Sequence, residues 1–418
     1  MKTVAKYLRS FALLLGCSWI LNGYGQDYPY LQATYPFINL KANHLIFPGD
    51  STAFSALQRR MDELLFKGKG QINIVHVGGS HVQADMWTER MRRLFRHTYD
   101  GTKGPRGLVF PFRMAHTNGP QSYSVRSTGK WSVRKNVGPP SVGSLGLTGY
   151  ALTTQDSACD IQVQFLPQSS YDFNRVKIFH DQDSSSFSMF VKENGLDLPL
   201  EHFPEKGYSQ FKFSGHAQTL DLVVRRTDST QRQFTLYGLV LENDDPGFVW
   251  HGVGVNGAST SSYLKCDLFK QHLAALNPDL IVFSVGINDA NTLQFDGRSY
   301  ERNYDTLVNW VRSVNPEVSI LFTTNTDSYY RKKYPNKNAA EVRDIMIRLA
   351  KRHRAAVWDC WSVMGGLGSI KSWVKAGLAN SDKVHMLAGG YELLGDLFFT
   401  AFWQHYDAHL KQFPDQSE

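Results

Sequence analysis

The sequence predicts an α/β protein with a doubly wound parallel sheet and an inserted all-β sandwich or jelly-roll domain. Toward both ends of the chain, apolar segments alternate with segments of helical periodicity, which is typical of parallel strands joined by helices. From about residue 121 to 244 the pattern changes to short alternating segments separated by turn residues, which indicates antiparallel strands. Because α/β segments lie on both sides of this region, it is most simply an insertion within one α/β domain.

The elements of the α/β part follow from periodicity. Residues 51–66 place apolar side chains on one helical face, with Asp50 or Ser51 as the cap. Residues 71–77 are then expected to form a strand and 82–97 a helix, with Ser80 in the turn between them. The later elements are expected to be a doubly buried strand at 279–285, a helix at about 300–314, a strand at 318–324, a helix at about 338–353, a strand at 355–360 and a last helix at about 388–410.

Composition excludes several classes of protein. The 418 residues are 42% hydrophobic and 20% charged, which is typical of a globular chain rather than a disordered one. The net charge of +7 is spread along the chain without an Arg/Lys-rich helix, so a nucleic-acid partner is not expected. Cys159, Cys266 and Cys360 have no metal-ligand spacing and are expected to be buried small hydrophobes. Neither a metal nor a cofactor is predicted, and the oligomeric state is left open.

The N-terminus has the plan of a secretory signal peptide. Basic Lys2, Lys6 and Arg9 precede an apolar stretch over 11–21, and cleavage is expected after Gly25. The apolar stretch is shorter than the ~20 residues of a spanning helix, and no later segment resembles one. We therefore expect export to the periplasm or cell envelope. Cys17 closes a segment that resembles a lipoprotein cleavage box, so a lipoprotein is the alternative.

Four segments carry candidate catalytic residues at or near the carboxyl ends of predicted strands, where doubly wound sheets form their sites. They are "HVGGSH" with Ser80, "GVGVNGAST" at 252–260, "VGINDAN" at 285–291 and "DKVH" at 382–385. In "DKVH", two residues separate Asp382 from His385, so one loop can present both side chains. Asp382 could then orient His385, which would deprotonate the Ser80 hydroxyl. Each of these short motifs alone is weak evidence for a catalytic site, and it is their combination in one chain that predicts one.

In this order, "GGSH", "GVNGA", "GIND" and "DKVH" resemble the four sequence blocks of the SGNH (GDSL-type) hydrolases, over roughly 70–115 and 245–410. The resemblance implies a flavodoxin-like fold with Ser80 as nucleophile and Asp382 and His385 completing the triad. It also implies an oxyanion hole made by the backbone N–H groups of Ser80 and Gly257 and the side chain of Asn288, which would stabilise the charge that develops on the tetrahedral oxygen. An ordinary α/β-hydrolase is disfavoured, because Val82 stands where its GxSxG elbow has the second glycine.

More narrowly, the "GSH" form and the inserted β region resemble peptidoglycan O-acetylesterases. The implied organisation is a signal peptide at 1–25, a hydrolase domain at 26–120 and 245–418, and a carbohydrate-binding-module-like insert at 121–244. One departure concerns Gly79, which stands where the family has aspartate. Glycine is expected to leave the serine loop without a side-chain anchor and with freer backbone torsions, which raises the prospect of weak or altered activity.

These observations predict an exported serine esterase that removes O-acetyl groups from an acetylated glycan, peptidoglycan or another cell-wall or dietary polysaccharide. Two alternatives stay open: a carbohydrate O-acetyltransferase that uses the same site, and a non-catalytic glycan-binding protein.

Other residues have simpler interpretations. His81 is read as a helix-start residue, His76 as a core histidine, and Asp289 as the cap of a turn. Packing or an interaction with the helix dipole is enough to explain Asp85 and Trp87 without a catalytic role. The last group is expected to be core or packed loop rather than sugar-binding: residues 104–112, Trp131, Tyr150 and Tyr171.

Overall fold

The computed structural model describes residues 35–99, 101–139 and 142–412. Its α/β part is built on a six-stranded sheet with the order β1-β20-β17-β16-β2-β15. All neighbouring strands are parallel except β1, which is antiparallel to β20. The strands are β1 (Leu45–Ile46), β2 (Gln71–Gly78), β15 (Gly247–Gly254), β16 (Leu280–Ser284), β17 (Ser319–Thr323) and β20 (Ala356–Trp358).

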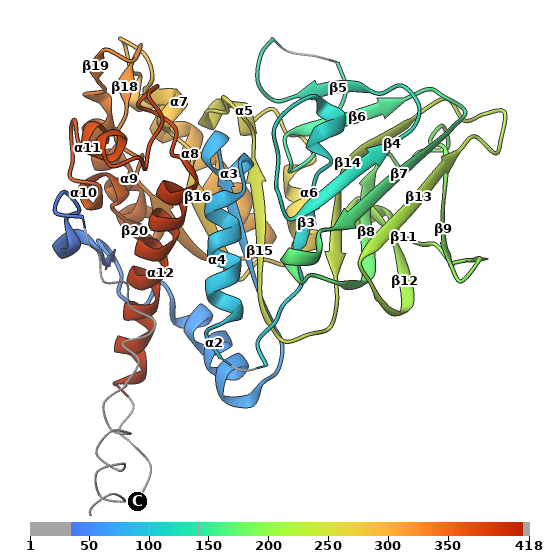
Figure 1. The fold of residues 1–418 in the computed structure, drawn as a ribbon, viewed down its shortest axis with the longest axis horizontal. Coiled ribbons are helices and arrows are strands. Elements are labelled where there is room, and N and C mark those ends of the chain that lie inside the picture. The colour runs from blue at the N-terminus through green and yellow to red at the C-terminus, as the bar shows by residue number, and fades with distance from the viewer. Residues whose placement is uncertain (1–34, 100, 140–141, 413–418) are drawn as a thin grey trace, which may run out of the picture. The chain divides into compact units, whose positions relative to one another are not determined.

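Helices lie on both faces of this sheet. Figure 1 shows α4 and α12 in front of it and α8 and α9 behind it. The helices are α2 (Ser55–Lys67), α3 (Ser80–Gln83), α4 (Met86–Arg96), α5 (Thr260–Tyr263), α6 (Phe269–Leu276), α7 (Ile287–Ala290), α8 (Gly297–Val314), α9 (Asn338–His353), α10 (Cys360–Val363), α11 (Ile370–Lys375) and α12 (Ala388–Leu410). The doubly wound α/β fold is confirmed, and the predicted helices at 338–353 and 388–410 coincide with α9 and α12.

Two antiparallel sheets make up the β region (Figure 1), as the alternating segments predict. One has the order β10-β9-β13-β7-β4, and the other β11-β12-β8-β14-β6-β5 with β3 added beside β14. Their strands are β3 (Gly107–Val109), β4 (Tyr123–Ser127), β5 (Ser132–Lys135), β6 (Tyr150–Thr154), β7 (Ala158–Phe165), β8 (Phe173–His180), β9 (Ser188–Glu193), β10 (Leu196–Asp197), β11 (Glu201–Phe203), β12 (Tyr208–Ala217), β13 (Thr219–Arg225) and β14 (Phe234–Glu242).

The β region and the α/β part share one hydrophobic core. The buried cluster contains side chains from β2 and β16 as well as from β7, β8 and β14. Strand β3, in the segment expected to be a packed loop, pairs with β14 and packs on β15, so it joins the two parts. Cys159, Cys266 and Cys360 are buried and unpaired, as expected.

Two helix predictions are wrong at their starts. The helix expected at 51–66 begins at Ser55, and neither Asp50 nor Ser51 caps it, because the Asp50 carboxylate instead accepts from Thr52 and pairs with Arg354. The helix expected at 82–97 is two helices, α3 and α4, separated at Asp85, which has a φ of 61°. There the buried Asp85 carboxylate accepts hydrogen bonds from Arg92 and Arg106, which hold it across the break.

Strand β15 was missed as a strand. Its sequence, "GFVWHGVG", ends in glycines of the kind that usually mark a loop. The close approach of α3 explains the last one, because a Cβ on Gly254 would lie 2.2 Å from the backbone nitrogen of Gln83. A strand that passes so near a helix cannot carry a side chain at this position.

The segment predicted to be a signal peptide, with Cys17, lies outside the described residues. Within the part of the chain that the structure describes, no helix is long and apolar enough to cross a membrane.

Candidate active site

Ser80 is the first residue of α3, and only Gly79 separates it from the end of β2. Strand β2 lies between β16 and β15, and its side chains from Ile74 to Val77 are buried, so it is a rigid support. The chain turns into α3 at Gly79, whose carbonyl accepts from the backbone N–H groups of Val82 and Gln83. Ser80 is thereby held, half-buried, at the carboxyl end of the parallel sheet.

The structure brings Ser80, His385 and Asp382 together in one hydrogen-bonded series. Ser80 Oγ lies 2.9 Å from His385 Nε2, and His385 Nδ1 lies 2.8 Å from Asp382 Oδ2. The other carboxylate oxygen of Asp382 accepts from the backbone N–H groups of Val384 (2.8 Å) and His385 (3.0 Å). The loop before α12 therefore fixes the carboxylate and, through it, the imidazole. This is the geometry by which a histidine withdraws a proton from serine.

Asp382 is ionised in this arrangement. Its partial burial opposes ionisation, but the hydrogen bonds from the His385 side chain and the two backbone N–H groups outweigh that effect and lower the pKa of Asp382 from 3.8. A permanent negative charge therefore lies beside His385 Nδ1. The His385 side chain is 44% exposed, so substrate and water can reach it from solvent.

Asn288 lies against the Ser80 turn. It belongs to α7, which follows β16, and its Nδ2 donates to Ala258 O at 2.8 Å. A Cβ placed on Gly79 would lie 3.3 Å from the same Nδ2. Gly257, next to Ala258, is exposed and has a φ of 81°. The side chain of Asn288 and the turn that carries Gly257 are thus joined directly, beside the backbone that leads into Ser80.

Gly79 differs from expectation in two ways. Its φ of −98° lies outside the left-handed region that favours glycine. The serine loop is also anchored without a side chain at this position, because Tyr263 donates its hydroxyl hydrogen to Gly78 O at 2.6 Å. The glycine instead leaves room for Asn288.

Sequence reasoning missed a buried hydrogen-bond network around Gln83, which is only 1% exposed. Its Oε1 accepts from the backbone N–H of Asn256 (2.6 Å) and from the Tyr150 hydroxyl (3.0 Å). Its Nε2 donates to Asn118 O (2.8 Å) and Thr117 Oγ1 (3.0 Å). The network joins α3, the Gly257 turn and the β region. The sequence feature that could have indicated this network is a glutamine three residues after the serine, on the buried face of the helix.

The remaining candidates have structural roles. His81 is buried, and its Nδ1 lies 2.9 Å from the Tyr391 hydroxyl, beside the ring of His385. His76 is a core histidine whose Nε2 lies 2.6 Å from Ser284 Oγ. The Asp289 carboxylate accepts from Thr260 N and Oγ1 at the start of α5, as a cap does. Trp87, Tyr150 and Tyr171 are buried, and Trp131 is partly buried against the core.

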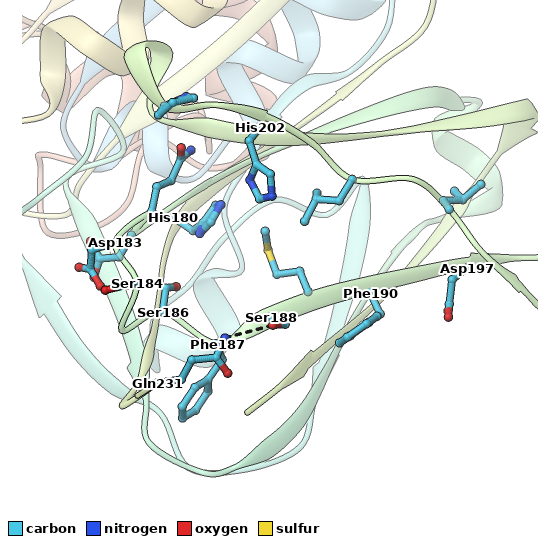
Figure 2. A pocket seen from close by; sticks show the side chains of 16 residues that line it. His180, Asp183, Ser184, Ser186, Phe187, Ser188, Phe190, Asp197, His202 and Gln231 are labelled. Atoms are coloured by element: carbon cyan, nitrogen blue, oxygen red, sulfur yellow. Dashed lines mark hydrogen bonds between the residues drawn. The ribbon is translucent and has the colours of Figure 1, made fainter. Parts of the chain in front are cut away.

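Two cavities adjoin the β region, and the proposed catalytic residues line neither of them. One cavity, of about 690 Å³, lies in the β region, where Figure 2 shows His180 and His202 among its lining residues. None of the predicted catalytic residues lines it. A cavity of about 290 Å³ is lined by Ala84 after α3, by Gln121 and Gln168 of the β region and by Ala388 of α12, so it lies where the β region meets the α/β part. Among the described residues, no group of three or more His, Cys, Asp or Glu side chains is arranged to hold a metal ion.

A serine, a histidine and a carboxylate in hydrogen-bonded series at the carboxyl end of a doubly wound parallel sheet define the class of serine hydrolases. Residues 225–393 match the GDSL-like Lipase/Acylhydrolase family. This segment is therefore similar to the GDSL-like lipase/acylhydrolase family, as the motifs within it predict. The matched segment contains Asn288, Asp382 and His385 but not Ser80, whose position rests on the geometry above.

One solved structure shares the fold over most of the chain. A structure of a peptidoglycan O-acetylesterase superposes with a TM-score of 0.69 at 21% identity, covering 87% of this chain and 99% of the other. An acetyl xylan esterase has a TM-score of 0.30 at 19% identity, covering 37% and 81% of the two chains. A lipase/acylhydrolase from Enterococcus faecalis has a TM-score of 0.30 at 19% identity, covering 41% and 80%. No curated protein matches the chain.

Proposed function

We propose that the chain is an exported serine esterase that removes O-acetyl groups from peptidoglycan. The observation that carries the proposal is the series from Ser80 Oγ through His385 to Asp382, with separations of 2.9 and 2.8 Å. The choice of polymer is supported by the likeness in fold, over 87% of the chain, to a solved peptidoglycan O-acetylesterase. Export is supported by the basic, apolar and small-residue order of the first 25 residues.

In the proposed reaction, His385 Nε2 takes the proton from Ser80 as Oγ attacks the acetyl carbonyl carbon. Negative charge then develops on the carbonyl oxygen, and the donors assigned to it are the N–H groups of Ser80 and Gly257 and the Asn288 amide. One N–H of that amide is used by Ala258 O, which orients the group and leaves the second N–H for the oxyanion. Asp382 stabilises the imidazolium that forms.

Collapse of the tetrahedral intermediate breaks the bond to the sugar oxygen, which receives the proton from His385. The acetyl group is left on Ser80 Oγ. His385 next takes a proton from water, whose oxygen attacks the acetyl carbonyl, and acetate leaves as the proton returns to Ser80. The exposure of 44% at His385 supports water as the acceptor, because a transferase must keep water from its acyl-enzyme.

The test compares the parent protein with Ser80→Ala on 4-nitrophenyl acetate and on O-acetylated peptidoglycan, with released acetate measured. Ser261→Ala, which removes an exposed hydroxyl on α5, is the matched control. The parent and the control should release acetate from both substrates, and Ser80→Ala should lose at least about 10³-fold in rate. Release from the aryl ester alone would reject peptidoglycan as the polymer. Acetyl transfer to an added glycan would favour the acetyltransferase, and no release at all would leave a non-catalytic binding protein.

A further inference from the structure

A short hairpin packs on the loop that carries Asp382 and His385. It consists of β18 (Tyr329–Tyr330) and β19 (Tyr334–Pro335) with the turn between them, and we call residues 329–335 the cationic hairpin. The backbone N–H of Tyr329 donates to Lys383 O at 3.0 Å, and Lys383 Nζ donates to Lys332 O at 2.8 Å. Figure 1 shows the hairpin at the same end of the parallel sheet as α3 and α7. It therefore borders the proposed active site.

Positive charge gathers at this hairpin without carboxylate partners. Arg331, Lys332 and Lys333 form its exposed turn. Beside it, the ammonium groups of Lys371 and Lys383 lie 5.6 and 4.9 Å from the centre of the Tyr329 ring. In the described parts of the chain, none of these five cations forms an ion pair with Asp or Glu. Asp382, the carboxylate next to Lys383, is bound to His385. Unpaired cations gathered on one surface attract anionic ligands.

The backbone at these cations is strained. Arg331, Lys332 and Lys383 have φ values of 49°, 62° and 57°, in the left-handed region that favours Gly or Asn. In this region the Cβ of each residue lies close to the following carbonyl oxygen, which is sterically unfavourable. Long cationic side chains at such positions do not help the hairpin to fold. A binding role for the side chains accounts for their presence.

Aromatic rings flank the charged turn. Tyr330 and Tyr334 are paired across the two strands, and Tyr334 is 62% exposed. The Arg331 guanidinium lies 5.2 Å from the centre of the Tyr330 ring. Tyrosine faces bind the apolar side of sugar rings, and arginine and lysine bind carboxylates. The combination suits a glycan that carries negative charge.

We infer that the cationic hairpin, with Lys371 and Lys383, binds carboxylate groups of the acetylated glycan beside the ester, so that the enzyme prefers an anionic polymer to a neutral one. The inference rests on the proposed esterase activity and names the charge of its substrate. Peptidoglycan meets the requirement, because its stem peptides carry free carboxylates. Neutral acetylated xylo-oligosaccharides carry none.

The test measures kcat/KM for three probes: O-acetylated peptidoglycan fragments, neutral acetylated xylo-oligosaccharides and 4-nitrophenyl acetate. The variant is Lys332→Glu/Lys333→Glu, and its matched control is Lys67→Glu/Lys69→Glu, which changes the net charge equally at exposed positions at and just beyond the end of α2. We expect the ratio of peptidoglycan to xylo-oligosaccharide kcat/KM to fall about tenfold in the hairpin variant and to change less than about twofold in the control. Added salt should lower the ratio for the parent and the control more than for the hairpin variant.

The outcomes separate the two proposals. Equal ratios in the parent and the hairpin variant, with aryl acetate still hydrolysed, would overturn the role of the hairpin and leave the esterase standing. A fall of the same size in both double variants would also overturn it, because net charge alone would then explain the preference. Failure of the parent protein to hydrolyse any of the three esters would overturn the proposed function itself.

Discussion

Tyr150 of β6 donates its hydroxyl hydrogen to Gln83 Oε1 at 3.0 Å, and this bond joins the β region to the helix that begins at Ser80. The same Oε1 accepts from the backbone N–H of Asn256, the residue before Gly257. Gln83 and Tyr150 are therefore positioning residues, because they touch the elements that carry the proposed oxyanion donors and not the reacting atoms. The β region is thus hydrogen-bonded to the elements of the proposed active site whether or not it binds glycan.

This relationship predicts an effect on kcat. Tyr150→Phe removes one hydrogen bond worth about 1 kcal/mol and should lower kcat for 4-nitrophenyl acetate about fivefold. Gln83→Leu also leaves the buried Asn256 N–H unpaired and should lower kcat about a hundredfold, with little change in KM. Tyr123→Phe is the control, because this equally buried hydroxyl donates to Phe110 O, outside the network. A Tyr123→Phe variant as slow as Tyr150→Phe would contradict the positioning role.

Replacement of Asp382 tests the proposed triad. An asparagine cannot stabilise the imidazolium and favours the wrong tautomer of His385, so Asp382→Asn should lower kcat about 10³- to 10⁴-fold. The loss should disappear in a Ser80→Ala background, because triad members act as a unit. Equal losses in both backgrounds, measured by single-turnover acetate release, would show that Asp382 acts only on the fold.

Most of the α/β framework could be predicted because the sequence of each helix or strand itself determines where that element lies. The apolar run of β2 and the periodicity of α9 and α12 contain nearly all the information that fixes their bounds. The features that the sequence did not predict, the interruption between α3 and α4 and the strand β15, depend on residues far away in the chain. The interruption at Asp85 follows from Arg106, and the glycine that obscures β15 follows from the approach of Gln83.

The same distinction holds for the site. Ser80, His385 and Asp382 could be recognised because their chemistry restricts the residue types at each position. Gln83 and Tyr150 could not be, since any buried donor and acceptor of suitable shape could make the same link. Their partners are visible only once residues 67 positions apart are in contact.

Acid should destabilise the fold through its buried histidines. Burial lowers the pKa of His76, His81, His251 and His272 to about 3. In the unfolded chain these imidazoles take up protons below about pH 6.5, whereas in the folded chain they stay neutral, so the unfolded state binds more protons across this interval. The free energy of unfolding should therefore fall as the pH is lowered from 6.5 toward 3. The slope should be at most about 1.4 kcal/mol per pH unit for each histidine.

Urea unfolding at several pH values between 7.5 and 4 measures this slope. His272→Gln removes a buried titrating group and should make the slope shallower. His97→Gln removes an exposed histidine and serves as its control. Parallel curves for the parent and His272→Gln would show that this imidazole takes up its proton over the same pH range in the folded chain as in the unfolded chain.

Gly79 should be required in this chain because of Asn288. A Cβ at position 79 would lie 3.3 Å from Asn288 Nδ2, which is held on its other side by Ala258 O. Gly79→Ala should therefore displace the amide and lower kcat about tenfold, since misplacing one oxyanion donor loses part of the 10²- to 10³-fold that removing it costs.

Asn288→Ala alone should lose that full amount, and adding Gly79→Ala to it should cost less than about twofold more. Gly215→Ala, where a Cβ meets nothing within 4 Å, is the control and should match the parent. A tenfold loss from Gly79→Ala that persists in the Asn288→Ala background would mean that the glycine acts on the Ser80 turn itself and not through the amide.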